Sequence, residues 1–77
     1  EHGYADIFFR DNLDILHREA AVIAAMVAVE NADPQLAFHI QAGMGLGITR
    51  SETESIIRAA AQAAGRDAAK ALALIPG

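Results

Sequence analysis

Cysteine is absent from the chain. Without a thiol, the chain has no means of forming disulfide bonds, of thiolate catalysis or of cysteine-ligated zinc binding. Because disulfides are rare in the reducing cytosol, a chain without them fits that compartment, and we expect a cytoplasmic protein.

Positive charge is sparse and dispersed. The 77 residues carry 6 Lys and Arg against 10 Asp and Glu, which gives a formal net charge of −4. The basic residues stand singly along the chain, at Arg10, Arg18, Arg50, Arg58, Arg66 and Lys70. Nucleic acids and anionic membrane surfaces attract concentrated positive patches, so we expect neither as a partner.

Long apolar runs are missing as well. The longest covers the ten residues from Ala20 to Val29, about half of the ~20 that a bilayer span requires. Aromatic residues make up 5% of a chain that is 53% hydrophobic, and much of the remainder is alanine. Alanine buries little area per residue, so a small core built from it needs close helix packing or a partner subunit, which favours a homo-oligomer.

Strand signals are also lacking, and the pattern predicts an all-α fold of four to five short helices. We expect a short amphipathic turn or helix over residues 4–11, a polar break at Asp11-Asn12, and Asp14 as the N-cap of a long helix from about Ile15 to Glu30. Between residues 20 and 29 that helix is apolar on all sides, which predicts burial on every side.

The second half of the chain carries clearer helix boundaries. Asp33-Pro34 is typical of an N-cap followed by the first helical position. The glycines of residues 43–47 allow close backbone approach or end that helix. Thr49-Arg50-Ser51-Glu52 matches the capping box and starts a helix that stops at Gly65. A last helix is expected over residues 66–75.

Groups able to transfer protons at neutral pH are few. His39 is set midway along one expected helix, and Glu19 lies near the start of the apolar one. Because the ordinary pKa of histidine lies near neutrality, His39 can give and take a proton. The structural alternatives are a core histidine bonded to a carbonyl, and a carboxylate that merely favours its own helix dipole. The other two histidines lack partners at metal-ligand spacing, so we expect no metal site.

Arg10 is a candidate for substrate binding, because a guanidinium matches a carboxylate bidentately. Its alternative is an ion pair with Asp6 or Asp14. Phe38 and Met44 are expected to contact the core or a neighbouring subunit.

Together these segments resemble the carboxymuconolactone decarboxylase family. The resemblance rests on the block from Ala5 to Asp11, the pair Arg18-Glu19, Pro34-Gln35-Leu36 with His39, and the block from Gly47 to Glu52. Their order and spacing agree from about residue 3 to residue 65. The family domain usually has further helix before the first block, so we interpret residues 1–77 as a single domain truncated at its N-terminal side.

The resemblance implies an alkylhydroperoxidase D-like helical domain that assembles as a trimer or hexamer. The name-giving members decarboxylate a carboxylated muconolactone in aromatic-acid breakdown. A sister branch uses a Cys-x-x-Cys pair at positions that are Ala32 and Gln35 here, so thiol peroxidase chemistry is unavailable to this chain. Gln35 either bonds a substrate oxygen or caps its helix.

The resulting hypothesis is a lyase that decarboxylates a small carboxylated lactone or ring acid without a cofactor. The predicted catalytic residues are His39 and Glu19, which the resemblance implies form a proton relay with His39 as the acid/base and Glu19 orienting it or acting as its proton partner. The predicted substrate-binding residues are Arg10 and Gln35. The alternative is a non-catalytic helical oligomer that binds a small apolar ligand or forms a structural part of a larger enzyme.

Overall fold

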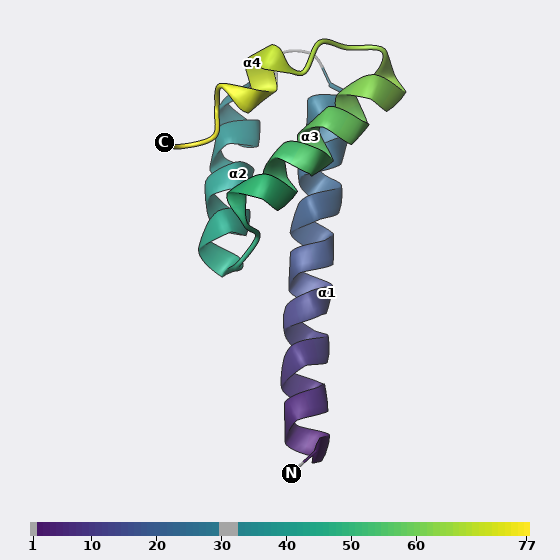
Figure 1. The fold of residues 1–77 in the computed structure, drawn as a ribbon, viewed down its shortest axis with the longest axis vertical. Helices are drawn as coiled ribbons and strands as arrows, with labels where there is room; N and C mark the ends of the chain where they lie inside the picture. The colour runs from purple at the N-terminus through teal and green to yellow at the C-terminus, as the bar shows by residue number, and fades with distance from the viewer. Residues whose placement is uncertain (1, 30–32) are drawn as a thin grey trace.

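The described residues form four helices in two layers (Figure 1). The structure is a computed structural model that describes residues 2–29 and 33–77, with side chains from residue 14 onward. The helices are α1 (His2–Val27), α2 (Asp33–Leu46), α3 (Arg50–Ala64) and α4 (Ala69–Leu72). No strand occurs in these ranges, and the predicted all-α fold is confirmed.

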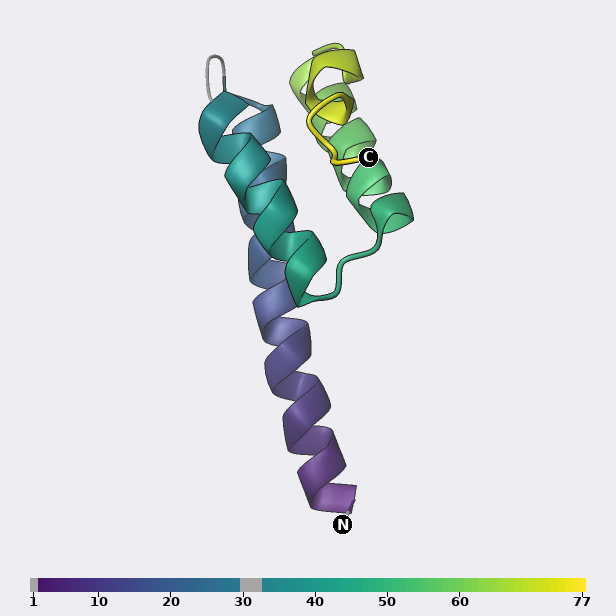
Figure 2. The ribbon, with the colours of Figure 1, turned by 90° about the vertical axis from the view of Figure 1, so that its left-hand side faces the viewer.

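Helices α1 and α2 run antiparallel and form one layer, and α3 with α4 forms the other (Figure 2). The N-terminal half of α1 extends beyond the remaining helices (Figure 1), and the molecule measures 46 × 25 × 19 Å. No helix in the described ranges combines the length and the apolar character needed to cross a membrane.

The predicted break at Asp11-Asn12 is wrong, because α1 is continuous from His2 to Val27. Asp14 therefore lies inside a helix and is not an N-cap. The reason is energetic: Asp and Asn cost a helix interior less than about 1 kcal/mol each, and among the residue types proline is the strong breaker. The helix ends three residues before the predicted Glu30.

The core lies where α1, α2 and α3 meet. Its largest fully buried side chains are Ile23 from α1, Ile40 from α2, and Ile57 with Thr53 from α3. The Thr53 hydroxyl donates a hydrogen bond of 2.9 Å to the carbonyl of Thr49, so its burial leaves no polar group unsatisfied. Burial of each isoleucine contributes about 1.5–3 kcal/mol.

The prediction that residues 20–29 are buried on every side is wrong for the single chain. Ala21 and Ala25 are exposed, and Val29 is 59% exposed. Phe38, expected in the core or at a subunit contact, stands outside the core, whereas Met44 packs against it. The reason is geometric: a two-layer fold this small covers only one face of α1 and α2.

Helix α3 begins and ends as predicted. The Thr49 hydroxyl accepts a hydrogen bond of 3.0 Å from the amide of Glu52, and the amide of Thr49 donates one of 2.8 Å to the Glu52 carboxylate. At the other end, Gly65 adopts the left-handed conformation (φ 70°) and donates its N–H to the last helical turn.

Helix α4 is shorter than the predicted residues 66–75. The Asp67 carboxylate accepts a hydrogen bond of 2.9 Å from the amide of Ala69, so the regular turn starts only there. Beyond Leu72 the chain continues in turns, and Arg50 donates a hydrogen bond of 2.6 Å to the carbonyl of Pro76. The C-terminal segment is therefore tied to the first turn of α3.

Removing the cap of α3 should destabilise the fold. We expect Thr49→Ala to lower the free energy of unfolding by about 1 kcal/mol, because the Glu52 amide loses its acceptor. Urea denaturation followed by circular dichroism measures this change. The control is Ser51→Ala, an exposed position in the same turn, which should stay within about 0.5 kcal/mol of wild type. Equal losses in both variants would contradict the role of the cap.

The capping box also predicts a pH dependence. The hydrogen bonds from the backbone and side chain of Thr49 hold the pKa of the Glu52 carboxyl below its ordinary value. A carboxyl whose pKa is lower in the folded state stabilises the fold above its unfolded pKa of about 4.3, and this contribution is lost as pH falls through the folded pKa. We therefore expect Glu52→Gln to lose less stability than wild type when the pH falls from about 5 to 3. Parallel curves for the two proteins would contradict this.

Candidate active site

The antiparallel pairing of α1 and α2 brings Glu19 and His39 into contact. His39 Nδ1 lies 3.0 Å from Glu19 Oε1, although the two residues are 20 positions apart in the sequence. The His39 side chain is 25% exposed and that of Glu19 is 20% exposed. The pair is thus half-buried between two helices, with part of the imidazole open to solvent.

The hydrogen bond orients the imidazole. An ionised carboxylate only accepts hydrogen bonds, so Nδ1 carries a proton that it donates to Glu19. In neutral imidazole this places the free lone pair on Nε2. Among the described side chains none is bonded to Nε2. The arrangement therefore leaves Nε2 as the ring nitrogen available to accept or donate a proton, while Glu19 holds the ring in place through Nδ1.

Gly43 explains why Glu19 reaches His39. A Cβ atom added at Gly43 would lie 3.0 Å from Ile48 Cδ1, 3.5 Å from Ile23 Cδ1 and 3.8 Å from Glu19 Cβ. The residue lies one helical turn after His39 on α2, so its missing side chain lets α1 approach at the level of the pair. Of the predicted glycine roles, Gly43 serves close approach, whereas Gly47 (φ 124°) ends α2.

A phenyl ring also borders the imidazole. The ring centroids of Phe38 and His39 lie 5.3 Å apart, with an interplanar angle of 86°. This is the edge-to-face arrangement that aromatic pairs prefer. Sequence reasoning missed the contact because adjacent helical residues point about 100° apart, and nothing in the sequence shows that the two side chains turn toward each other.

Of the two predicted substrate-binding residues, the structure describes the side chain of Gln35 but not that of Arg10. Gln35 lies one helical turn before His39 on α2 and is exposed, which places it on the same side of the helix. Arg10 belongs to α1, but its side chain lies outside the described residues. The structure thus brings His39 and Glu19 together, with Gln35 adjacent, and leaves the role of Arg10 a prediction.

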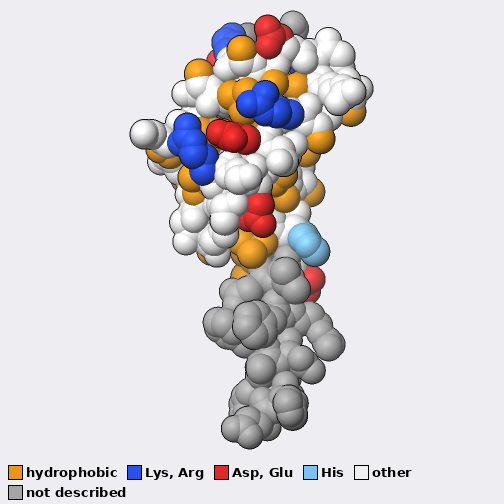
Figure 3. Space-filling model, viewed as in Figure 1, with side chains coloured by type: hydrophobic (Ala, Val, Ile, Leu, Met, Phe, Trp, Pro, Cys, Tyr) orange, Lys and Arg blue, Asp and Glu red, His pale blue; other side chains and the backbone are white. Residues whose placement is uncertain are grey.

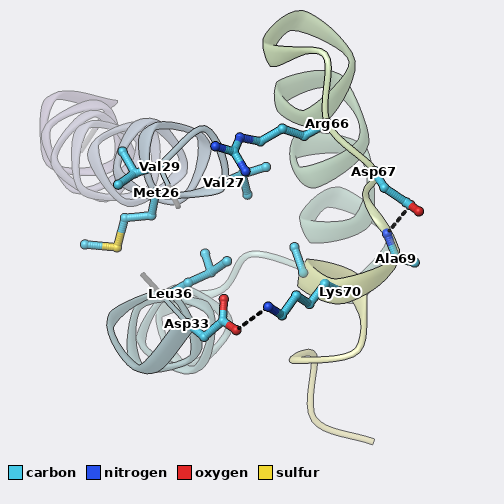
Figure 4. Close-up of a pocket in the computed structure, with 10 residues that line it drawn as sticks. Met26, Val27, Val29, Asp33, Leu36, Arg66, Asp67, Ala69 and Lys70 are labelled. Atoms are coloured by element: carbon cyan, nitrogen blue, oxygen red, sulfur yellow. Dashed lines mark hydrogen bonds and ion pairs between the residues drawn. The ribbon is translucent and has the colours of Figure 1, made fainter. Parts of the chain in front are cut away.

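The main surface hollows among the described residues are not lined by Glu19 or His39. The larger, about 620 Å³, separates the end of α1 and the start of α2 from residues 66–71 (Figure 4). Lys70 Nζ lies 3.5 Å from Asp33 Oδ2 across it, so this hollow contains an ion pair that links α4 to α2. The smaller, about 390 Å³, lies between α1 and α3 and is lined mainly by apolar side chains such as Leu16, Ile48 and Ile56.

Charge on the described surface is mixed. On the face seen in Figure 3, basic and acidic side chains alternate, with apolar patches between them. Within the described ranges no three His, Asp or Glu side chains gather closely enough to hold a metal ion. The charged group that accompanies the imidazole in the described structure is therefore the Glu19 carboxylate.

Comparison with known proteins decides the family. The model described as the carboxymuconolactone decarboxylase family matches residues 1–76. The chain belongs to the carboxymuconolactone decarboxylase family. No curated protein and no solved structure matches it. The resemblance inferred from the sequence blocks is thereby confirmed, and the match includes both Glu19 and His39.

Gly43 offers a test of how the pair is held. We expect Gly43→Val to lower the free energy of unfolding by about 1–3 kcal/mol, because its side chain would press on Ile48 and Ile23 and separate α1 from α2. The matched control is Gly45→Ala, since a Cβ at Gly45 meets nothing within 4 Å. That change should raise stability by about 0.5–1 kcal/mol. Thermal and urea unfolding measure both, and a Gly43→Val protein as stable as wild type would contradict the close contact.

Proposed function

We propose that this member of the carboxymuconolactone decarboxylase family is a cofactor-independent carboxy-lyase acting on a small carboxylated lactone or ring acid. The observation that carries the proposal is the 3.0 Å hydrogen bond between His39 Nδ1 and Glu19 Oε1. It leaves Nε2 free of bonds to the described side chains and partly open to solvent, as a proton-transferring group requires.

The chemistry assigned to His39 is proton transfer to carbon. When the ionised substrate carboxylate leaves as CO₂, the electron pair of the broken C–C bond passes into the conjugated ring system and forms a dienolate. Protonated His39 then delivers its Nε2 proton to the carbon, and the imidazole later regains a proton from water. Glu19 is the positioning residue, because its negative charge stabilises the imidazolium and its oxygen keeps the ring oriented.

Gln35 is proposed to bind a substrate oxygen. Its amide lies one turn from His39 on the exposed side of α2, where it can donate a hydrogen bond to a ring carbonyl or carboxylate. Arg10 is proposed, from the sequence alone, to bind the carboxylate bidentately.

Self-association is part of the proposal. Four large hydrophobic side chains are exposed among the described residues: Ile15, Val29, Phe38 and Leu46. Ile15 belongs to α1, Phe38 and Leu46 belong to α2, and Val29 lies in the segment directly after α1. Helices α1 and α2 are the ones that supply Glu19 and His39. Exposed apolar surface of this kind favours coverage by further copies of the chain, in a trimer or hexamer.

The test is CO₂ release from 4-carboxymuconolactone. We expect wild type to turn over this compound and His39→Ala to lower kcat by about 10²–10⁴-fold, because the proton donor is lost. Glu19→Gln should lower kcat by a smaller factor, since it keeps the hydrogen-bond acceptor but removes the charge.

His17→Ala is the matched control, because this exposed histidine of α1 contacts neither member of the pair. It should turn over substrate at the wild-type rate. All variants are compared at the same oligomeric state, measured by light scattering. An inactive, correctly assembled wild type would exclude this substrate, and an active His39→Ala would exclude the proposed proton donor.

A further inference from the structure

We infer that Phe38 is a ligand-contact residue that makes the site prefer planar, conjugated ring acids to saturated ones of the same size. The inference rests on the proposed function, since it assumes that the ligand binds beside His39. It goes beyond that function by assigning a specificity-determining residue to it.

Phe38 is exposed, although burial of a phenyl side chain would stabilise the fold. Its side chain is 66% exposed, more than the 39% to 59% of the other exposed large hydrophobics. It is also the only Phe or Tyr among the described side chains. The buried face of α2 is formed by Leu36, Ile40 and Gly43, and Phe38 lies about 140–160° around the helix from them. The core therefore does not explain a phenyl ring at this position.

The position of the ring relative to His39 is defined. The edge-to-face contact at 5.3 Å places the phenyl group directly beside the imidazole. Glu19 bonds Nδ1 of the same ring, so the imidazole contacts both a carboxylate and an aromatic ring. A ring acid hydrogen-bonded at Nε2 extends over several ångströms and is therefore large enough to contact Phe38 as well.

This geometry distinguishes flat ligands from puckered ones. A conjugated ring packs against a phenyl group in offset or edge-to-face geometry and gains quadrupole attraction, which a saturated ring lacks. The expected preference in affinity is about 2- to 10-fold. A planar dienolate, the intermediate assigned to the proposed reaction, would benefit from the same surface.

The test measures binding and does not require turnover. Furan-2-carboxylate, a planar ring acid, and tetrahydrofuran-2-carboxylate, its saturated counterpart, are titrated separately into the full chain, and the His39 ring resonances are followed by NMR. We expect wild type to prefer the planar acid by about 2- to 10-fold, Phe38→Leu to bring the ratio close to 1, and Phe38→Tyr to retain it. Leu46→Ala, a second exposed apolar position on α2, is the control and should retain the wild-type ratio.

Three results would overturn the inference. They are an unchanged ratio in Phe38→Leu, the absence of any shift of the His39 resonances by the planar acid, and an altered oligomeric mass of Phe38→Leu with the ratio retained. The last would make Phe38 a subunit contact. A wild-type protein that prefers the planar acid but releases no CO₂ would support the role of Phe38 and contradict the proposed lyase activity. The two proposals can therefore fail separately.

Discussion

The close contact of α1 with α2 at Gly43 is the constraint on which the site depends. Because Gly43 has no side chain, the side chains of Ile23 and Ile48 occupy the space that a Cβ atom would need there. The Cβ of Glu19 lies within van der Waals distance of the same space. One turn earlier on α2, the same approach brings the Glu19 carboxylate to His39 Nδ1. The approach of α1 to α2 at this level, and with it the orientation of the imidazole, thus depends on the absence of a side chain at Gly43.

The chemistry follows from what surrounds the imidazole. Glu19 holds one nitrogen, Phe38 borders the ring, and Nε2 is left toward a partly open surface. The remaining exposed large hydrophobic side chains belong to α1, to α2 or to the segment directly after α1. In the proposed assembly, a neighbouring copy would cover a ligand at Nε2. Exclusion of water in this way strengthens the carboxylate–imidazole interaction and favours decarboxylation.

Much of this was predictable from the sequence, and the failures have physical causes. The Thr49–Glu52 capping box and the Gly65 stop depend on local hydrogen bonds, so local sequence is enough to place them. The break at Asp11-Asn12 was wrong because weak helix formers do not end a helix that has already begun. The pairing of His39 with Glu19 came from the family pattern, since periodicity alone does not give the register between two helices. The Phe38 contact depends on side-chain rotamers, which no spacing rule specifies.

The site works as proposed only if Glu19 holds the Nδ1 proton of His39 and leaves Nε2 as the reactive nitrogen. The tautomer of His39 can be read from its two ring ¹⁵N chemical shifts by NMR at alkaline pH, where an imidazole is neutral. We expect a protonated Nδ1 and an unprotonated Nε2 in wild type, with this preference weakened in Glu19→Ala. A wild-type His39 that carries its proton on Nε2 would show that Glu19 does not set the tautomer.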